Sequence, residues 1–164
     1  MAAPASLGFD AVIAAPFGGI GVRVAAGAVA EIVYLPASIP PQAPRGALAG
    51  RVARQVRAYL KDPDTRFDLP LAERGTAFQQ RVWRAVAALK SGETATYGAI
   101  ARTIASGPRA VGQACGANWF PLVIPCHRVL AAGGIGGFAQ HDDDGFHLGV
   151  KRWLLAHEGV RGYA

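Results

Sequence analysis

Cys126 and His127 are neighbours in the sequence and carry the side chains that nucleophilic catalysis by a thiol requires. The thiolate is the reactive form of cysteine, and an imidazole held by a carboxylate can take the thiol proton. We choose Glu158 as the candidate carboxylate, because it ends an apolar helical stretch that should pack on the core. These three residues alone favour the simpler alternative, a buried packing cysteine beside a chance histidine.

Neither a metal nor the second cysteine is expected to take part in this chemistry. His141, Asp142, Asp144 and His147 offer metal-binding side chains, but their spacing fits no zinc pattern, and a polar loop tip explains them. Cys115 lies among small residues with no base beside it, so we interpret it as a packing residue. We therefore expect no metal and no cofactor.

The composition indicates a globular protein of a reducing compartment. Hydrophobic residues make up 51% of the 164 residues, which is enough to bury a core and excludes a disordered chain. The N-terminus lacks the charged and apolar regions of a secretory signal, and no apolar run approaches the about 18 residues of a membrane helix. We expect a cytoplasmic protein without a membrane partner.

The charge balance favours a polyanionic partner. Seventeen Lys and Arg residues against eleven Asp and Glu residues give a formal net charge of +6. Such a surface attracts nucleic acids, because phosphate contacts release condensed counterions. Charge alone does not identify DNA, since many basic proteins bind no nucleic acid.

Residues 1–72 are expected to form a small N-terminal α/β domain. The stretch from residue 9 to residue 36 is rich in Val, Ile and Ala and is broken at Gly18-Gly19 and Ala26-Gly27, which predicts three short antiparallel strands. Apolar residues then recur at helical spacing over residues 48–60, with arginines on the other face that we assign to solvent. A Pro-containing turn ends this helix.

Residues 73–164 are expected to form a mainly helical domain, so the whole chain is α+β. Apolar spacing predicts helices at about 78–89, 97–104, 109–116 and 150–157. The second and third are joined by Ser106-Gly107-Pro108, which suggests a helix-turn-helix. Leu122-Val123-Ile124 predicts a short buried strand that places Cys126 at its end.

The predicted helix at 109–116 contains two glycines, and each costs about 1 kcal/mol relative to alanine. A bare helix face lets the backbone approach another surface closely. That surface could be a DNA groove, with Arg109 entering the base stack, or a neighbouring helix. The glycines support the two interpretations equally.

Several motifs, in the same order, resemble the O6-alkylguanine-DNA alkyltransferases, also called methylated-DNA–protein-cysteine methyltransferases. Pro-Cys-His-Arg-Val at 125–129 is preceded by Asn118 and by Arg-Ala-Val-Gly at 109–112, as in that family's active-site region. The similarity extends over most of residues 75–159. Residues 1–72 resemble the family's variable N-terminal domain, which has an RNase H-like layout, only in their order of elements.

The resemblance implies a role for each matching residue. Cys126 is the alkyl acceptor, His127 deprotonates it through a water, Glu158 orients the histidine, and Asn118 braces the turn that holds the thiol. Tyr97 and Arg109 help to turn the damaged nucleotide out of the duplex. The remaining positions are DNA contacts at Ala110, Gly112 and Arg128 and pocket residues at Val129, Phe138 and Ala139.

The implied function is direct repair of double-stranded DNA. An alkyl group passes from O6-alkylguanine, or from O4-alkylthymine, to Cys126 without a cofactor, and each molecule reacts once. We expect a monomer, with cooperative binding along DNA left open. Two alternatives remain: an alkyltransferase-like protein that flags damage without transfer, although those proteins lack the reactive cysteine, and a cysteine hydrolase that uses the same three residues.

The loop after Gly137 departs from the family pattern. It is longer than usual, lacks the usual serine and carries three consecutive aspartates at 142–144, which we expect to point to solvent because they would oppose DNA phosphates. The connection from Tyr97 to Arg109 is short for the family. We expect no zinc-binding methylphosphotriester module like that of some relatives, because these 164 residues lack its cysteines.

Overall fold

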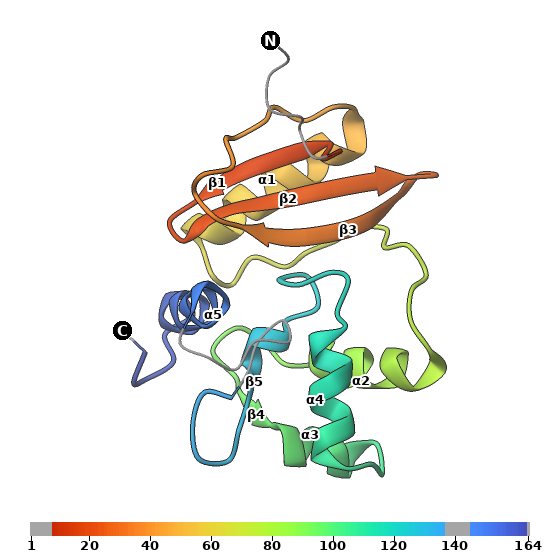
Figure 1. The fold of residues 1–164 in the computed structure, drawn as a ribbon, viewed down its shortest axis with the longest axis vertical. Helices are drawn as coiled ribbons and strands as arrows, with labels where there is room; N and C mark the ends of the chain where they lie inside the picture. Colours follow the sequence, from red (N-terminus) through yellow and green to blue (C-terminus); the bar gives the residue numbers. More distant parts are fainter. Residues whose placement is uncertain (1–7, 137–144, 164) are drawn as a thin grey trace. The chain divides into compact units, whose positions relative to one another are not determined.

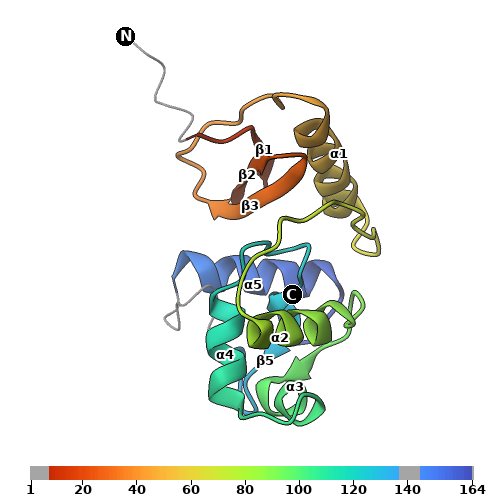
Figure 2. The same cartoon turned by 90° about the vertical axis from the view of Figure 1, so that its right-hand side faces the viewer.

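The computed structural model describes residues 8–136 and 145–163. Contacts divide the chain into two compact units, Met1–Glu73 and Arg74–Ala164, which we call the N-terminal unit and the C-terminal unit (Figures 1 and 2). This division falls next to the domain boundary predicted after residue 72. The described residues form a small antiparallel sheet and five α-helices, so the predicted α+β class is confirmed.

The sheet of the N-terminal unit is a three-stranded meander, as predicted. Its strands are β1 (Ala11–Ala15), β2 (Gly18–Ala25) and β3 (Ala28–Leu35), paired antiparallel in the order β1-β2-β3. The first turn is made by Pro16 and Phe17, so the two glycines expected there belong to β2 instead. Ala26 and Gly27 make the second turn, both with positive φ.

The helix α1 (Ala47–Lys61) packs on the sheet of this unit (Figure 2). Its apolar face is buried, with Val52, Val56 and Tyr59 fully inaccessible to solvent. Arg54 and Arg57 are exposed, as the sequence predicts for the polar face. Burial of this apolar face is the main source of the helix's stability.

The C-terminal unit contains the remaining helices and a two-stranded parallel sheet. The helices are α2 (Ala77–Ala87), α3 (Tyr97–Thr103), α4 (Pro108–Gly116) and α5 (Phe146–His157), and the strands are β4 (Ala95–Thr96) and β5 (Val129–Leu130). Local sequence sets the helix starts: Thr76 and Gln79 form a capping box on α2, and Thr96 caps α3. None of the helices in the described ranges has the length and apolar character needed to cross a membrane.

The predicted strand at 122–124 is wrong. Leu122 has a φ of +78°, and Ile124 N donates to Phe120 O at 2.8 Å, so this segment is a turn. Two prolines, Pro121 and Pro125, bound the segment and remove ladder donors, which overrides its β-branched composition. Cys126 therefore begins a short 3-10 helix, η1 (Cys126–Arg128), and the strand β5 follows it.

Candidate active site

The Cys126 thiol lies in the interior of the C-terminal unit, and the residue is only 3% exposed. It is the first residue of η1, where Cys126 N donates to Ile124 O at 2.8 Å and Arg128 N donates to Pro125 O at 2.9 Å. These bonds fix the backbone on both sides of the sulfur. The thiol thus has a defined position before any partner binds.

Asn118 braces the segment that leads to the thiol. Its Nδ2 donates to Ile124 O, and its Oδ1 accepts from Phe120 N, each at 2.8 Å. The same side chain hydrogen-bonds to Cys126, which favours the thiolate and opposes the effects that raise the pKa of that thiol. Asn118 therefore lies where the sequence comparison expects a brace.

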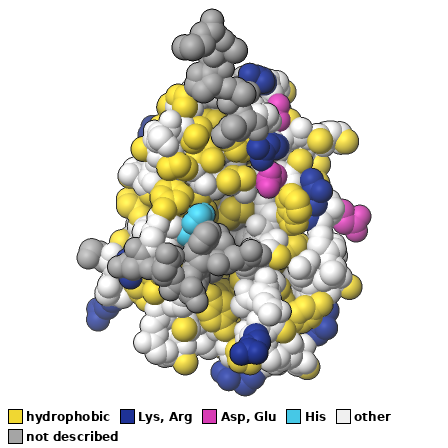
Figure 3. Space-filling view, in the orientation of Figure 1, with side chains coloured by type: hydrophobic (Ala, Val, Ile, Leu, Met, Phe, Trp, Pro, Cys, Tyr) yellow, Lys and Arg dark blue, Asp and Glu magenta, His cyan; other side chains and the backbone are white. Residues whose placement is uncertain are grey.

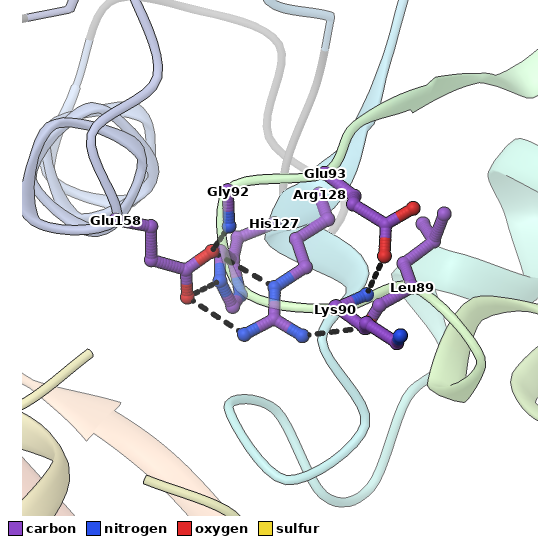
Figure 4. Close-up of polar contacts among 7 residues, drawn as sticks. All are labelled: Leu89, Lys90, Gly92, Glu93, His127, Arg128 and Glu158. Atoms are coloured by element: carbon purple, nitrogen blue, oxygen red, sulfur yellow. Dashed lines mark hydrogen bonds and ion pairs between the residues drawn. The ribbon is translucent and has the colours of Figure 1, made fainter. Parts of the chain in front are cut away.

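His127 and Glu158 form a buried pair with no solvent exposure of either side chain (Figure 4). His127 Nε2 lies 2.8 Å from Glu158 Oε2. A carboxylate can only accept, so Nε2 carries the ring hydrogen and Nδ1 keeps its lone pair. Among the described residues, Nδ1 has no hydrogen-bond partner. Burial lowers the pKa of His127 despite Glu158, so the imidazole is neutral at pH 7.

Arg128 corrects the expectation of a DNA contact. Its Nε and Nη2 donate to the two carboxylate oxygens of Glu158 at 2.8 and 2.9 Å, and its Nη1 donates to Leu89 O at 2.7 Å. The side chain is 11% exposed. The guanidinium is committed to these internal partners, so it belongs to the active site and is unavailable to a phosphate.

Cys115 is not merely a packing residue, because its thiol hydrogen-bonds to the Cys126 thiol. This bond, together with burial, raises the pKa of Cys126 well above its usual value. The free protein therefore holds Cys126 as a protonated thiol, and its activation requires a base. The sequence shows no sign of this pairing, since the two cysteines lie on α4 and η1 and meet only in the fold.

Lys151 is a second site residue, after Cys115, whose role the sequence does not predict. It is fully buried on α5, and its Nζ donates to Val129 O at 2.8 Å. Burial lowers its pKa to about 8, while the thiols of Cys115 and Cys126 oppose that shift. Its positive charge lowers the pKa of Cys126. The helical spacing to Leu154 and Leu155 could have revealed it, because residues three and four apart share a face.

Tyr97 begins α3 and places its ring between two glycines. A Cβ at Gly112 would lie 3.9 Å from the ring, and a Cβ at Gly136 would lie 3.0 Å from Tyr97 Cε2. Burial and the two thiols raise the pKa of Tyr97, so it remains a phenol. A Cβ at Gly112 would make only ordinary van der Waals contact with the ring, so Tyr97 does not require this glycine of α4, whereas at Gly136 the ring leaves little room for a side chain. Lys151 Nζ lies 5.8 Å from the centre of the ring.

The other expected contact residues occupy different environments. Arg109 is exposed in the first turn of α4, and Ala110 beside it is half-buried. Val129 is fully buried, and its predicted place in the substrate pocket stays a prediction. Phe138 and Ala139 lie outside the described residues. Of the four side chains weighed as metal ligands, those of His141, Asp142 and Asp144 also lie outside the described residues. The ring of the fourth, His147, packs against Phe146.

Basic side chains are exposed on the helices around the site. On the face drawn in Figure 3, Lys and Arg side chains are scattered over both units, and some of them lie at the end that holds α3, away from the Asp and Glu side chains visible on this face. Arg102 on α3 and Arg109 on α4 are both exposed. This charge distribution suits an approaching polyanion.

Comparisons with known proteins agree with these features. A family model described as 6-O-methylguanine DNA methyltransferase, DNA binding domain, matches residues 77–160. A methylated-DNA–protein-cysteine methyltransferase from Mycobacterium tuberculosis is 43% identical over 122 residues, which are 73% of this chain and 70% of that protein. A protein of the same name from Methanosarcina acetivorans is 41% identical over 110 residues, 65% of this chain and 67% of that protein.

The regulatory protein Ada of Salmonella typhimurium is 43% identical over 111 residues, 66% of this chain but only 30% of Ada's length. Among solved structures, the Mycobacterium tuberculosis O6-methylguanine methyltransferase has a TM-score of 0.73 at 33% identity, covering 90% of both chains. A Mycobacterium tuberculosis protein titled OGT in complex with DNA has a TM-score of 0.75 at 34% identity, covering 90% of this chain and 91% of that one.

Proposed function

Because the chain belongs to the 6-O-methylguanine DNA methyltransferase family, we propose that it repairs DNA by moving an alkyl group from O6 of guanine to Cys126. The observation that carries this proposal is the buried pair of His127 and Glu158, 2.8 Å apart, next to a buried thiol. A flagging protein of the same fold needs no such thiol. A base held by a carboxylate is what a protonated thiol requires before it can react.

The chemistry follows from the protonation states. His127 Nδ1 has a lone pair, because Nε2–H is directed at Glu158, and it takes the proton of Cys126 through a bridging water. The sulfur attacks the alkyl carbon, a C–S bond forms, and the C–O6 bond breaks. The guanine leaves as its lactam anion and is then protonated. Lys151 and Asn118 stabilise the thiolate while it forms.

The thioether product explains why each molecule reacts once. A thiolate is a poor leaving group from a saturated carbon, so the thioether is stable once it has formed. The thiol is both the nucleophile and the final acceptor, so the reaction requires no cofactor. The protein is consumed in proportion to the lesions it repairs.

The C-terminal unit is proposed to bind DNA through α3 and α4, used as a helix-turn-helix. Arg109 is exposed at the start of α4 and can fill the place of an extruded base, while the phenol of Tyr97 crowds the adjacent phosphate. A Mycobacterium tuberculosis protein of the same fold has been solved in complex with DNA, which supports DNA binding by this chain. Recognition by shape and extrusion predicts little sequence preference.

One experiment tests the proposal. Wild-type protein, Cys126→Ala and Cys115→Ala are mixed with duplex DNA that contains one O6-methylguanine, digested and analysed by mass spectrometry. We expect a methyl group on the Cys126 peptide of the wild type and of Cys115→Ala only. An unmodified Cys126 peptide despite tight binding would favour the flagging role, and a methyl group on Cys115 would overturn the assignment of the acceptor.

A further inference from the structure

The guanidinium of Arg128 joins three segments of the C-terminal unit (Figure 4). Arg128 lies on η1, its Nε and Nη2 bind both oxygens of Glu158 after α5, and its Nη1 binds Leu89 O in the loop after α2. Two parallel N–H···O bonds to one carboxylate are the strongest geometry that an arginine can offer. Arg128 is therefore the residue that fixes where the carboxylate lies.

The two oxygens of Glu158 are shared between Arg128 and other donors. Oε2 lies 2.8 Å from His127 Nε2 and 2.9 Å from Arg128 Nη2. Oε1 accepts from Arg128 Nε at 2.8 Å and lies 3.5 Å from Gly92 N. A neutral imidazole, one carboxylate and one guanidinium make a group with no net charge. Such a balance matters here, because an unpaired charge in the interior is strongly unfavourable.

We propose that Arg128 is a positioning residue for alkyl transfer, which acts by neutralising Glu158 so that His127 keeps an unprotonated Nδ1. The carboxylate then orients the imidazole without drawing a second proton onto it. This inference rests on the proposed function, because it assigns His127 as the base for Cys126. It gives Arg128 a task inside the protein in place of the DNA contact expected from the sequence.

The consequence of removing the guanidinium follows from proton counting. The buried Glu158 would be left without its positive partner, and the pair of Glu158 and His127 would take up one proton. If that proton binds the imidazole, both ring nitrogens carry hydrogen. If it binds the carboxylate and points at Nε2, the ring hydrogen moves to Nδ1. In both cases Nδ1 can no longer accept the proton of Cys126.

The other charged groups around His127 do not replace Arg128. Lys151 on α5 is buried near the thiols, and its charge, like that of Arg128, lowers the pKa of His127. Cys126 is a neutral thiol in the free protein, and the side chains of Lys90 and Glu93 in the loop after α2 are exposed. Among these groups, Arg128 alone holds the carboxylate directly.

The test compares Arg128→Gln with Arg57→Gln, which removes an equal charge from an exposed position on α1 in the other unit. Two quantities are measured: the titration and tautomer of His127 by NMR of its ring nitrogens, and the pH dependence of single-turnover methyl transfer. In Arg128→Gln, we expect His127 to titrate at a higher pH than in the wild type. We also expect methyl transfer at pH 7 to be slower by roughly 10-fold or more, with partial recovery of the rate toward pH 9. Arg57→Gln should match the wild type in both.

Two further variants keep the inference testable if Arg128→Gln folds poorly. The double variant Arg128→Gln/Glu158→Gln removes both charges, so His127 should again be neutral with its hydrogen on Nε2. Its pH profile should regain the wild-type shape even if the rate is lower. Arg128→Lys keeps the charge but loses the paired bonds, so its profile should lie between those of the wild type and Arg128→Gln.

The inference is overturned if folded Arg128→Gln shows the wild-type titration of His127, or if the double variant keeps the shifted profile of Arg128→Gln. If Arg128→Gln does not fold, the double variant alone decides: a pH profile of methyl transfer that is shifted from that of the wild type overturns the inference. Failure of the proposed function is a separate result. In that case the wild type would transfer no methyl group, whereas the titration of His127 would still respond to the charge at position 128.

Discussion

Glu158 and His127 lie 31 positions apart in the sequence, yet Glu158 Oε2 and His127 Nε2 are 2.8 Å from each other in the interior. The contact forms because α5 ends where η1 begins its turn, and the C-cap of that helix is Glu158 itself. The relationship selects one histidine tautomer. The ring hydrogen lies on Nε2, and the proposed deprotonation of Cys126 depends on the lone pair that this leaves on Nδ1.

Glu158→Gln should retain a hydrogen-bond acceptor for His127 but lose the negative charge that stabilises the imidazolium as the proton moves. We expect methyl transfer to slow by about 10-fold to 100-fold in single-turnover experiments. The matched control is Glu93→Gln, which changes an exposed carboxylate in the nearby loop and keeps its acceptor for Lys90 N. Equal rates for Glu158→Gln and the wild type would contradict the role of Glu158.

Cys115→Ala should make Cys126 more reactive. The hydrogen bond that the Cys126 thiol donates to Cys115 is the largest cause that raises the pKa of Cys126, so its loss should lower that pKa. Reaction with iodoacetamide at pH 8 should then proceed several-fold faster, because reactivity follows the thiolate fraction. The truncation should cost on the order of 1 kcal/mol of stability. Peptide mapping separates the two thiols in the wild type, and an unchanged rate would show that Cys115 does not control the acceptor.

Lys151→Met tests the buried charge through the pH dependence of stability. The pKa of Lys151 is about 8 in the folded chain, against an unfolded value near 10.5. Between these values the unfolded chain binds more protons, so this group makes the wild type more stable as pH rises. The free energy of unfolding of the variant minus that of the wild type should fall by about 3 kcal/mol from pH 7 to pH 10.

Urea denaturation of both proteins across that range provides the measurement. Loss of the bond to Val129 O affects the variant at every pH, so only the slope of the difference reports the charge. A difference that does not change with pH would mean that Lys151 is not desolvated as its position indicates.

Asn118→Ala should destabilise the active-site turn. The substitution leaves Ile124 O and Phe120 N without the side-chain partner that each has at 2.8 Å. We expect a loss of about 2 kcal/mol in the free energy of unfolding and slower methyl transfer. Asn118→Asp is the comparison, because it keeps the acceptor for Phe120 N but not the donor for Ile124 O. If Asn118→Ala unfolds like the wild type, the bracing role is wrong.

The sequence was sufficient for features that depend on local patterns. Helical spacing predicts α1, α2 and α5, and the end of α5 points to Glu158 as the carboxylate that partners His127. The two short helices around residue 107 were also visible, because Gly107 and Pro108 mark the start of α4. In each case the residues that identify the helix lie within it or within one helical turn of its end.

The features that the sequence did not reveal depend on distant residues. The segment at 122–124 is β-branched, but a positive φ at Leu122 and the bond from Asn118 hold it as a turn. Arg128 looks like a DNA contact beside the active-site cysteine until the fold brings Glu158 to it. Cys115 and Lys151 gain their roles in the same way, from contacts made between separate elements.

The most direct test of the central claim is the stoichiometry of repair at Cys126. A fixed amount of protein is incubated with increasing excess of duplex DNA containing O6-methylguanine, and the restored guanine is counted. We predict a plateau at one guanine per chain, with every Cys126 thiol methylated at the plateau. Repair that continues past one equivalent, or a plateau reached with Cys126 unmodified, would contradict the account.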